Sequence, residues 1–564
     1  MKRNGAQILW ECILREGVDT IFGFPGGSTL PIYDAMSEFP IHHILVRHEQ
    51  GAAHMADGYA RATGKVGVAL ATSGPGATNL VTGIATAFMD SSPMVCITGQ
   101  VQSWFIGYDA FQETDVTGIT LPITKHNYLV SSVEEINETV REAFYLARSG
   151  RPGPVLIDIT KDAQMAELDW EYDDSPIQLP GYRPDFSPNE ANLKQAAAMI
   201  AEAERPLILA GAGVIRSGAM QEMLKLAEST QTPIAATLLG IGSAPASNPL
   251  YLGMMGMHGE AWVNQAIQEA DLLLAMGMRF DDRVTGNMAT YAPNARKIHF
   301  DIDPSEINKN VKVNLSLIGD LKDTLNQLLP HLESADHRPW LEKINAERQE
   351  TAQRDILNWP DNGKLHAAHV IHDIWKHTGG KALVVTDVGQ HQMWTAQYYS
   401  HEEPNTLITS GGLGTMGFGL PAALGAKRGR PEADVWVIAG DGGFQMTQAE
   451  LSTAAQEGLK VNVAVINNGY LGMVRQWQDL FYSRRYNATP MRGPDFVKIA
   501  EAHGLTGIRV TRRDEIEDAI RQAHQDPGTV VIDFRVEEED NVYPMVSAGA
   551  DLDKMIRRPL PEQS

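Results

Sequence analysis

The chain has 564 residues, several times the usual size of one domain, so we expect two to four domains, each with its own core. Hydrophobic residues make up 43 % and charged residues 21 % of the chain, a balance that excludes a disordered or fibrous protein. The formal net charge of -23 disfavours nucleic acid and anionic membrane surfaces as partners, so an anionic ligand needs local cations, backbone N–H groups or a metal.

The cysteines and the N-terminus indicate a cytoplasmic protein. Only Cys12 and Cys96 occur, which excludes a disulfide framework and a Cys-rich metal site and fits a reducing compartment. The apolar residues 8–14 are interrupted by Glu11 and followed by Arg15, which predicts an amphipathic helix and not a signal peptide. No apolar run approaches the roughly 20 residues that cross a bilayer, so no membrane span is expected.

The first segment, to about residue 165, has the pattern of a parallel α/β domain. Short apolar runs alternate there with Gly-rich turns and helical stretches. The predicted strands are residues 20–24, 44–46, 67–71, 94–98 and 155–159. Residues 167–186 are acidic, aromatic and Pro-rich without periodicity, which predicts an interdomain linker.

The same pattern returns twice. The second segment has predicted strands at 206–210, 233–237, 272–275 and 297–300, and the third at 382–386, 434–439, 461–467 and 529–534. A polar, charged stretch at 333–362 separates them. We predict three doubly wound parallel-sheet domains, at 1–165, 187–330 and 363–545, followed by a tail at 546–564.

Two turns of the third domain carry oxygen ligands at predicted strand ends. The first is Gly440-Asp441-Gly442-Gly443, and the second, about 25 residues later, is Asn467-Asn468. Ligands gather at the carboxyl ends of strands in open parallel sheets. Asp441 and Asn468 would suit Mg²⁺, completed by a backbone carbonyl and diphosphate oxygens, while a helix starting near Phe444 would offer N–H groups to the anion. Either motif alone is better explained by ordinary turn chemistry.

Together the two motifs resemble the GDG…NN signature of thiamine-diphosphate enzymes. That resemblance implies that Gly440, Gly442 and Gly443 approach the diphosphate and that Tyr470 joins the metal ligands. In this family a glutamate of the first domain hydrogen-bonds the pyrimidine ring of the cofactor, and Glu49 matches it. Without the resemblance, Glu49 would be expected only to favour the helix macrodipole.

Further matches extend through the first and third domains. Residues similar to those that line the pyrimidine end are Phe24, Pro25, Gly26, Thr72, Pro75 and Asn79. Phe24 stands where the family usually has Tyr. Gln112 matches a residue that reaches into the same site, although it could instead be a surface helix cap. Gln390 and His391 resemble the stretch that meets the diphosphate, and Met416 the residue that bends the cofactor, although a lone Met is more often core filler.

The middle domain resembles the acetolactate synthase family in the segment Met278–Gly286, which binds FAD there and supplies an active-site arginine. The positions that match flavin-contacting residues are Arg151, Gly211, Thr237, Leu238, Met257, His258, Gly277, Arg279, Asp281, Asp301, Ile302 and Asp320. A full dinucleotide fingerprint is absent, because Arg216 occupies the place of the third glycine after Gly211 and Gly213.

Two residues are candidates for contacting the second substrate. The guanidinium of Arg283 could hold a 2-keto acid carboxylate at two points, although a pair with Asp281 or Asp282 is the competing interpretation. Trp477 matches a bulky residue that in the family favours 2-ketobutyrate. Its helical spacing from Leu471 and Val474 would also fit an ordinary core stripe. Gln102 replaces a Pro or Ser of many relatives, which puts herbicide sensitivity in doubt without affecting the chemistry.

The resemblance implies a carboligase that uses thiamine diphosphate, Mg²⁺ and FAD. Its expected reaction is decarboxylation of pyruvate and ligation to pyruvate or 2-ketobutyrate, the first common step of branched-chain amino-acid biosynthesis. It also implies a homodimer or higher homo-oligomer with shared active sites and a small regulatory subunit. The alternatives are a flavin-dependent pyruvate oxidase of the same fold, a dinucleotide-dependent oxidoreductase and a non-catalytic binding protein.

Overall fold

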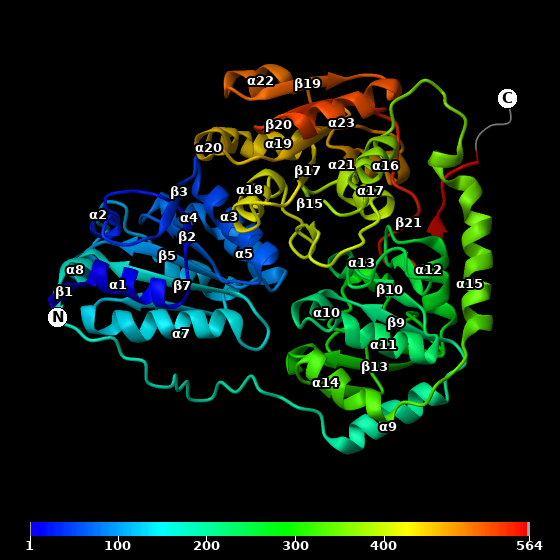
Figure 1. Ribbon diagram of the computed structural model, residues 1–564, viewed down its shortest axis with the longest axis horizontal. Helices are drawn as coiled ribbons and strands as arrows, with labels where there is room; N and C mark the ends of the chain where they lie inside the picture. The colour runs from blue at the N-terminus through cyan, green and yellow to red at the C-terminus, as the bar shows by residue number, and fades with distance from the viewer. Residues whose placement is uncertain (1, 561–564) are drawn as a thin grey trace.

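The computed structural model describes residues 2–560, so residues 561–564 of the predicted tail lie outside the described part. Three six-stranded sheets, all parallel, dominate the molecule (Figure 1). Alternate residues of the inner strands belong to different hydrophobic cores. In β4 (Gly67–Ala71), Val68 and Leu70 join one core and Ala69 and Ala71 another. Both faces of the sheet are therefore covered, which confirms the doubly wound class.

The first and third sheets share one topology. The first has the order β3-β2-β4-β5-β7-β6 and the third β16-β15-β17-β18-β20-β19, the same order when each is numbered from its own first strand. The first sheet consists of β2 (Thr20–Phe24), β3 (His42–Leu45), β4, β5 (Met94–Gln100), β6 (His126–Val130) and β7 (Pro154–Thr160). The third consists of β15 (Leu383–Thr386), β16 (Leu407–Ile408), β17 (Val435–Gly440), β18 (Asn462–Asn467), β19 (Thr506–Val510) and β20 (Val530–Arg535).

The central sheet has a different order, β11-β10-β9-β12-β13-β14, which is the order of dinucleotide-binding folds. Its strands are β9 (Pro206–Ala210), β10 (Ile234–Ala236), β11 (Tyr251–Met254), β12 (Leu272–Met276), β13 (Arg296–Asp301) and β14 (Leu315–Ile318). Strand order reverses between β9 and β12. Such folds form a ligand crevice at the carboxyl ends of the two strands that flank this reversal.

The inner strands were predicted well and the edge strands poorly. The predictions for β2, β4 and β9 match to the residue, whereas β6, β11, β14, β16 and β19 were not predicted. All five lie at the edges of their sheets. Edge strands are short and partly exposed, so they lack the continuous apolar run that identifies a strand buried on both faces.

The helices cover the sheets. Those of the first domain are α1 (Gly5–Arg15), α2 (Leu30–Met36), α3 (Glu49–Thr63), α4 (Pro75–Asn79), α5 (Val81–Met89), α6 (Val116–Thr120), α7 (Ile136–Arg148) and α8 (Lys161–Met165). Those around the central sheet are α9 (Glu190–Ala201), α10 (Ala212–Arg216), α11 (Met220–Thr230), α12 (Ala261–Glu269), α13 (Asp282–Thr285), α14 (Leu321–Leu328) and α15 (Arg338–Thr351). Those of the third domain are α16 (Ala367–Thr378), α17 (Gln390–Tyr398), α18 (Gly419–Gly429), α19 (Asp441–Thr447), α20 (Leu451–Glu457), α21 (Gly472–Phe481), α22 (Phe496–Ala502) and α23 (Ile516–Gln525).

One connecting segment differs from its prediction. Residues 333–362 were expected to be a polar separator, but α15 forms within them and runs along the outer side of the central domain (Figure 1). Trp340 and Ile344 of α15 are buried in the core of that domain. Two apolar side chains four residues apart give this otherwise charged helix its packing face. The linker at 167–186 begins with a short strand, β8 (Glu167–Asp169), which pairs with β1 (Lys2–Asn4). The rest of the linker runs along the outside of the molecule, as expected (Figure 1).

The first and third domains pack through α3 and α18. A Cβ atom at Gly58 would lie 2.0 Å from the carbonyl oxygen of Ala422, and one at Gly425 would lie 1.9 Å from that of Met55. The two helices can approach this closely only because both positions lack a side chain. Their residues join one hydrophobic core that spans both domains. The start of the tail packs elsewhere, because Val546 and Leu552 are buried with the central domain.

Candidate active site

The two predicted ligand turns meet at one edge of the third sheet. β17 and β18 are parallel neighbours, with Gly440 opposite Ile466. Asp441 is the first residue of α19, so the helix begins there and not near Phe444 as expected. The side chain is buried, and the backbone N–H groups of Gly442 and Gly469 lie close enough to its carboxyl group to act against the rise in its pKa. Asp441 therefore lies against the turn that carries Asn468.

The chemistry of this edge fits a hard cation. Burial raises the pKa of Asp441 to about 7, and its Oδ2 atom is buried without a hydrogen-bond partner. Asn468 accepts a hydrogen bond from the backbone N–H of Tyr470 (3.1 Å) and donates one to Gln390 (3.3 Å). Residues 2–560 contain no cluster of three or more His, Cys, Asp or Glu side chains suited to a metal. A metal at this edge would therefore be held by one carboxylate, by amide and carbonyl oxygens, and by oxygens of a bound substrate or cofactor. Mg²⁺ is commonly bound in this way.

The glycines of this motif bring other predicted residues close. A Cβ atom at Gly440 would lie 2.9 Å from Nδ1 of His391, and one at Gly442 would lie 3.4 Å from Cε of Met416. The His391 ring is buried, which lowers its pKa to about 3, and its Nε2 atom has no partner. A neutral imidazole at this edge can donate one N–H group to an anion without adding charge.

A buried carboxylate that the sequence did not reveal supports the same edge. A Cβ atom at Gly443 would lie 2.0 Å from Oδ1 of Asp387. Asp387 accepts hydrogen bonds from the backbone N–H groups of Gly417 (3.0 Å), the residue directly after Met416, and of Gly419 (2.9 Å). The signal available in the sequence was an Asp at the end of the strand β15, which is too common to be specific.

The predicted pyrimidine-end residues cluster around Glu49, the first residue of α3. Asn79 donates a hydrogen bond to the Glu49 carboxylate at 2.9 Å. A Cβ atom at Gly26 would lie 2.5 Å from the Thr72 side chain, and one at Gly76 would lie 3.2 Å from Oε1 of Glu49. The close contacts of these three βα turns therefore gather about one carboxylate. Phe24, Pro25 and Pro75 are exposed beside them.

Gln112 belongs to this cluster and is not a helix cap. It lies in a turn with φ +60, and a Cβ atom at Gly74 would be 2.9 Å from the Cβ of Gln112. The helix-cap alternative is therefore wrong. The neighbouring loop is open to solvent, with Phe111 88 % exposed.

The third domain supports the turn before Glu49. The carboxylate of Glu450 is buried and accepts hydrogen bonds from the backbone N–H groups of Arg47 (3.0 Å) and His48 (3.1 Å), and from the hydroxyl of Thr453 (2.6 Å). An acceptor at this place satisfies donors at the start of α3. No local pattern in the sequence pointed to Glu450.

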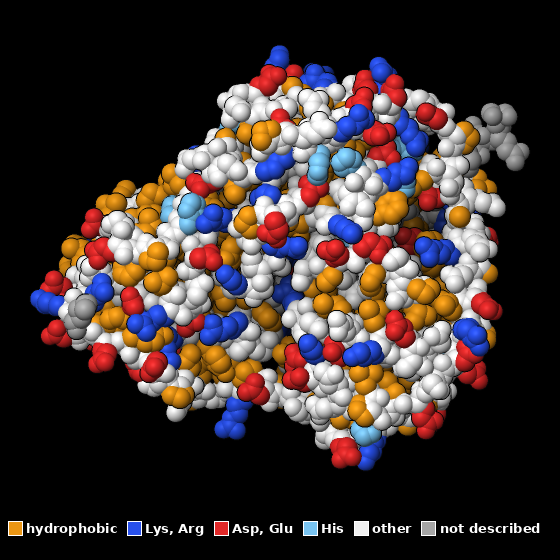
Figure 2. Space-filling view, viewed as in Figure 1, with side chains coloured by type: hydrophobic (Ala, Val, Ile, Leu, Met, Phe, Trp, Pro, Cys, Tyr) orange, Lys and Arg blue, Asp and Glu red, His pale blue; other side chains and the backbone are white. Residues whose placement is uncertain are grey.

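A cleft of about 1090 Å³ lies where the three domains meet. In Figure 2 the surface is hollowed between the first and central domains, and Lys and Arg side chains border the hollow. It lies at the carboxyl ends of the central strands, the edge expected for a nucleotide. The predicted flavin-contacting residues that line it are Arg151, Thr237, Leu238, Met257, His258, Gly277, Arg279, Asp281, Asp301, Ile302 and Asp320. Gly211 is not among the lining residues; a Cβ atom there would be 2.2 Å from the carbonyl oxygen of Gly277.

Three residues of this set, two of them acidic, have structural roles as well. The side chain of Asp281 accepts hydrogen bonds from the first turn of α13, and that of Asp320 from the first turn of α14. Thr237 accepts one from the backbone N–H of Gly240 (3.1 Å). These caps fix the cleft wall, because each satisfies a free N–H group at a helix start.

The cleft also contains both residues expected to contact the second substrate. The Arg283 side chain is 59 % exposed, and its nearest acidic atom is Oδ2 of Asp282 at 3.8 Å. So long and exposed a pair leaves the guanidinium free for a ligand. Trp477 lines the third-domain part of the cleft together with Met473. The buried residues of α21 are Arg475 and Gln476, while Val474 is half exposed, so the core-stripe alternative is wrong.

The fold and site define a class. Two sheets of one topology carry, respectively, a helix-initial glutamate and a strand-end Asp/Asn pair, and a nucleotide-type sheet lies between them in the chain, as in thiamine-diphosphate enzymes. Residues 3–119, 193–328 and 387–534 match the N-terminal TPP binding domain, the central domain and the C-terminal TPP binding domain of thiamine pyrophosphate enzymes. Within residues 2–560, no helix has the length and apolar character needed to cross a membrane.

Relatives narrow this class. The chain is 48 % identical to the acetolactate synthase large subunit of Corynebacterium glutamicum, over 97 % of this chain and 89 % of that protein. It is 48 % identical to the acetolactate synthase of Mycobacterium leprae, over 98 % and 90 %. It is 44 % identical to the large subunit of acetolactate synthase isozyme 3 of Escherichia coli, over 98 % of both chains. The chain belongs to the acetolactate synthase large-subunit family of thiamine-diphosphate-dependent enzymes.

Proposed function

We propose that this chain is the catalytic subunit of an acetolactate synthase that decarboxylates pyruvate and joins the remaining two-carbon unit to a second 2-keto acid. The second substrate would be pyruvate or 2-ketobutyrate. The observation that supports this most strongly is that Arg283 and Trp477 line one cleft from the central and third domains. A cation for a carboxylate and a bulky wall for the alkyl group are what a carboligase needs to choose its second substrate.

Each residue has a role that follows from its position. Mg²⁺ would be held by Asp441, Asn468 and the Tyr470 carbonyl. The diphosphate would be contacted by Gln390 and His391.

Thiamine diphosphate, when bound, supplies the electron sink for breaking and forming the carbon–carbon bonds. Glu49, oriented by Asn79, would hold the proton at the pyrimidine ring. Met416 would support the bend of the cofactor.

The central cleft is the proposed FAD site. The strand order, the caps at Asp281 and Asp320 and the cluster of arginines on its walls support a nucleotide there. Arg151 is partly committed, because it pairs with Glu306 (2.8 Å) and Asp303 (3.2 Å). Arg279 is paired only loosely, because its nearest acidic atom, Oδ2 of Asp281, is 3.7 Å away. Arg279 is therefore the better candidate for binding a phosphate.

The active site is proposed to be shared between two copies of the chain. Glu49 and Asp441 belong to different sheets, and neither lines the three-domain cleft. Beside Gln112 the first domain exposes a loop of large apolar side chains, Trp104, Phe105, Tyr108 and Phe111. Such a patch is typical of an interface. A second copy placed there would cover the patch and bring its own third domain to Glu49.

Mixing two inactive variants tests this arrangement. Glu49→Gln and Asp441→Ala chains, unfolded together and refolded, should regain activity, because each mixed dimer would contain one site free of both substitutions. Each variant refolded alone is the control. Activity that stays at the level of the single variants would contradict shared sites.

A product assay tests the reaction. Purified protein with thiamine diphosphate, Mg²⁺, FAD and pyruvate should form acetolactate while the flavin stays largely oxidised. A flavin-dependent pyruvate oxidase would instead bleach the flavin under anaerobic conditions. Acetolactate absent together with stoichiometric bleaching would replace the proposed reaction by that one.

The remaining proposals concern partners and place. The relatives named as large subunits support a small regulatory subunit for this chain. Two buried free cysteines, Cys12 and Cys96, support the reducing cytoplasm as its compartment. Co-purification with a tagged small subunit, and a change in feedback inhibition when it is present, would test the first.

A further inference from the structure

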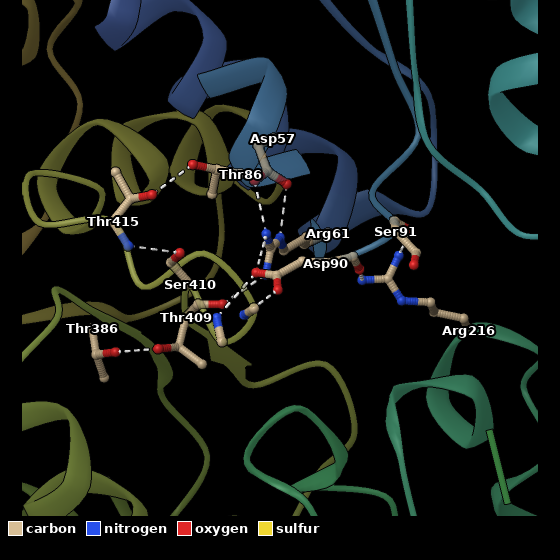
Figure 3. Close-up of polar contacts among 12 residues, drawn as sticks. Asp57, Arg61, Thr86, Asp90, Ser91, Arg216, Thr386, Thr409, Ser410 and Thr415 are labelled. Carbon is tan, nitrogen blue, oxygen red and sulfur yellow. Dashed lines mark hydrogen bonds and ion pairs between the residues drawn. The ribbon is translucent and has the colours of Figure 1, made fainter. Parts of the chain in front are cut away.

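A buried ion cluster lies where the first, central and third domains meet (Figure 3). Arg61 of α3 binds Asp57 with two nitrogens, at 2.7 and 2.8 Å, and Asp90 with one, at 2.9 Å. The side chains of Asp57 and Asp90 are fully buried, and that of Arg61 nearly so. Buried ion pairs of this kind are costly to break, because the group left behind is an unpaired buried charge.

Asp90 connects this cluster to a loop of the third domain. Its carboxylate accepts hydrogen bonds from the backbone N–H groups of Gly411 (3.1 Å) and Gly412 (2.6 Å). Arg61 donates to the carbonyl oxygen of Thr409 at 2.7 Å. Hydrogen bonds to a carboxylate or from a guanidinium are stronger than those between neutral groups. The first domain thus holds the beginning of the loop at residues 409–418.

The other side of the loop is held as well. The hydroxyl groups of Thr415 and Thr86 are 2.7 Å apart, and the backbone N–H of Thr415 donates to the Ser410 hydroxyl at 3.0 Å (Figure 3). Met416 follows directly. The loop contains Gly411, Gly412, Gly414 and Gly417, so its own backbone has little preference for one conformation. Contacts with α3 and α5, together with the hydrogen bond from Gly417 to Asp387, therefore select its conformation.

The central domain contributes Arg216. Its guanidinium donates to the carbonyl oxygens of Asp90 and Ser91 and also lines the cleft (Figure 3). Ser91 has φ +56, a left-handed conformation that few residues adopt unless their surroundings hold them. With Arg216 the cluster has two carboxylates and two guanidinium groups, so its formal charges balance. Arg216 is the residue that interrupts the glycine fingerprint after Gly211.

We propose that Asp90 and Arg216 are positioning residues, through which the first and central domains fix the loop that presents Met416 to the thiamine-diphosphate site. The inference rests on the proposed function for the identity of that site. Neither residue touches thiamine diphosphate in this proposal. Asp90 acts through the amides of Gly411 and Gly412, and Arg216 acts through the Asp90–Ser91 turn.

Hydrogen–deuterium exchange of the cofactor-free protein tests the anchoring itself. Asp90→Asn should speed exchange of the Gly411 and Gly412 amides at least tenfold while amides of the inner strands stay within twofold. Arg216→Met should also speed exchange of these two amides, but by less. It provides a second test of the anchoring if Asp90→Asn does not fold. Arg338→Met, which removes an exposed arginine paired with Asp336, is the matched control. Faster exchange spread evenly over the chain would mean a general loss of stability and would overturn the proposal.

Binding of thiamine diphosphate tests the consequence. In the presence of Mg²⁺, Asp90→Asn and Arg216→Met should weaken thiamine diphosphate binding at least fivefold by calorimetry, and Asp90→Asn should leave FAD binding within twofold. Unchanged thiamine diphosphate affinity in both variants would refute a positioning role. A wild-type chain that binds no thiamine diphosphate would refute the proposed function instead, while the exchange experiment would still decide the loop anchoring.

Discussion

Glu450 accepts a hydrogen bond from the backbone N–H of Arg47 at 3.0 Å, although 403 residues separate them in the chain. The same carboxylate accepts from His48, the residue directly before Glu49. A side chain of the third domain therefore caps the helix that begins with the proposed catalytic glutamate. Within one chain, the third domain would therefore both hold the metal and orient Glu49. In the proposed dimer, that Glu49 would serve the active site completed by the third domain of the other chain.

Replacing Glu450 should affect both stability and turnover. Glu450→Ala leaves two partly buried backbone N–H groups without their acceptor, which should lower the free energy of unfolding by about 1–3 kcal/mol and reduce kcat more than KM. Urea unfolding and steady-state kinetics measure the two effects. Gly51→Ala should act in the same direction, since its Cβ atom would lie 2.4 Å from Oε1 of Glu450. Full activity in both variants would argue against this cap.

Glu49→Gln should reduce turnover by about 10²- to 10⁴-fold, because the amide cannot exchange a proton with the cofactor. The fold should persist, since Asn79 is the only side chain hydrogen-bonded to Glu49 in the described structure and can also pair with an amide. Rates of acetolactate formation and thermal unfolding are the measurements. Glu38→Gln, an exposed change near Gln7, is the control. Wild-type turnover in Glu49→Gln would remove this residue from the mechanism.

Removal of the metal should abolish cofactor binding. Treatment with a chelator should prevent binding of thiamine diphosphate, and added Mg²⁺ should restore it, because a cation is needed between the Asp441 carboxylate and the diphosphate. Asp441→Ala should bind the cofactor weakly with or without Mg²⁺. Calorimetric titrations measure both, with the exposed change Asp336→Asn as control. Equal affinity with and without Mg²⁺ in the wild-type chain would exclude a metal at this edge.

Trp477→Leu should change substrate preference more than total activity. Loss of the indole removes the wall that would discriminate one methylene group, an effect of about 1–3 kcal/mol at most. The ratio of 2-aceto-2-hydroxybutyrate to acetolactate from mixed keto acids should fall accordingly. Val474→Ala, on the same helix but outside the cleft lining, should leave the ratio unchanged. A constant ratio in Trp477→Leu would assign the preference elsewhere.

The contact between α3 and α18 should be sensitive to a single methyl group. Gly58→Ala and Gly425→Ala each place a Cβ atom far inside van der Waals contact with a carbonyl oxygen, at 2.0 and 1.9 Å respectively. Each should destabilise the chain by about 1–3 kcal/mol or more, because the helices must move apart. Gly528→Ala, whose Cβ atom would be 3.5 Å from its nearest neighbour, is the control. Denaturant midpoints equal to that of the wild type would show that the helices can adjust freely.

The sequence alone determined the interior of each sheet and the ligand turns. Inner strands such as β4 and β9 are buried on both faces, so their residues form unbroken apolar runs that can be recognised locally. Asp441 and Asn468 follow two such strands, and parallel neighbours end at one edge, so their proximity could be expected from strand order. The edge strands β6 and β19 carry mixed burial and gave no comparable signal.

Only the tertiary structure decided which side chains support the site. Glu450 reaches Arg47, Asp90 reaches Gly411 and Arg216 reaches Ser91, each across a domain boundary and more than a hundred residues of chain. A carboxylate or guanidinium pairs with whatever the packing of domains brings within about 3 Å, and no spacing along the chain encodes that partner. Local pattern therefore specified the elements and their ends, while the packing of three domains specified how those ends are held.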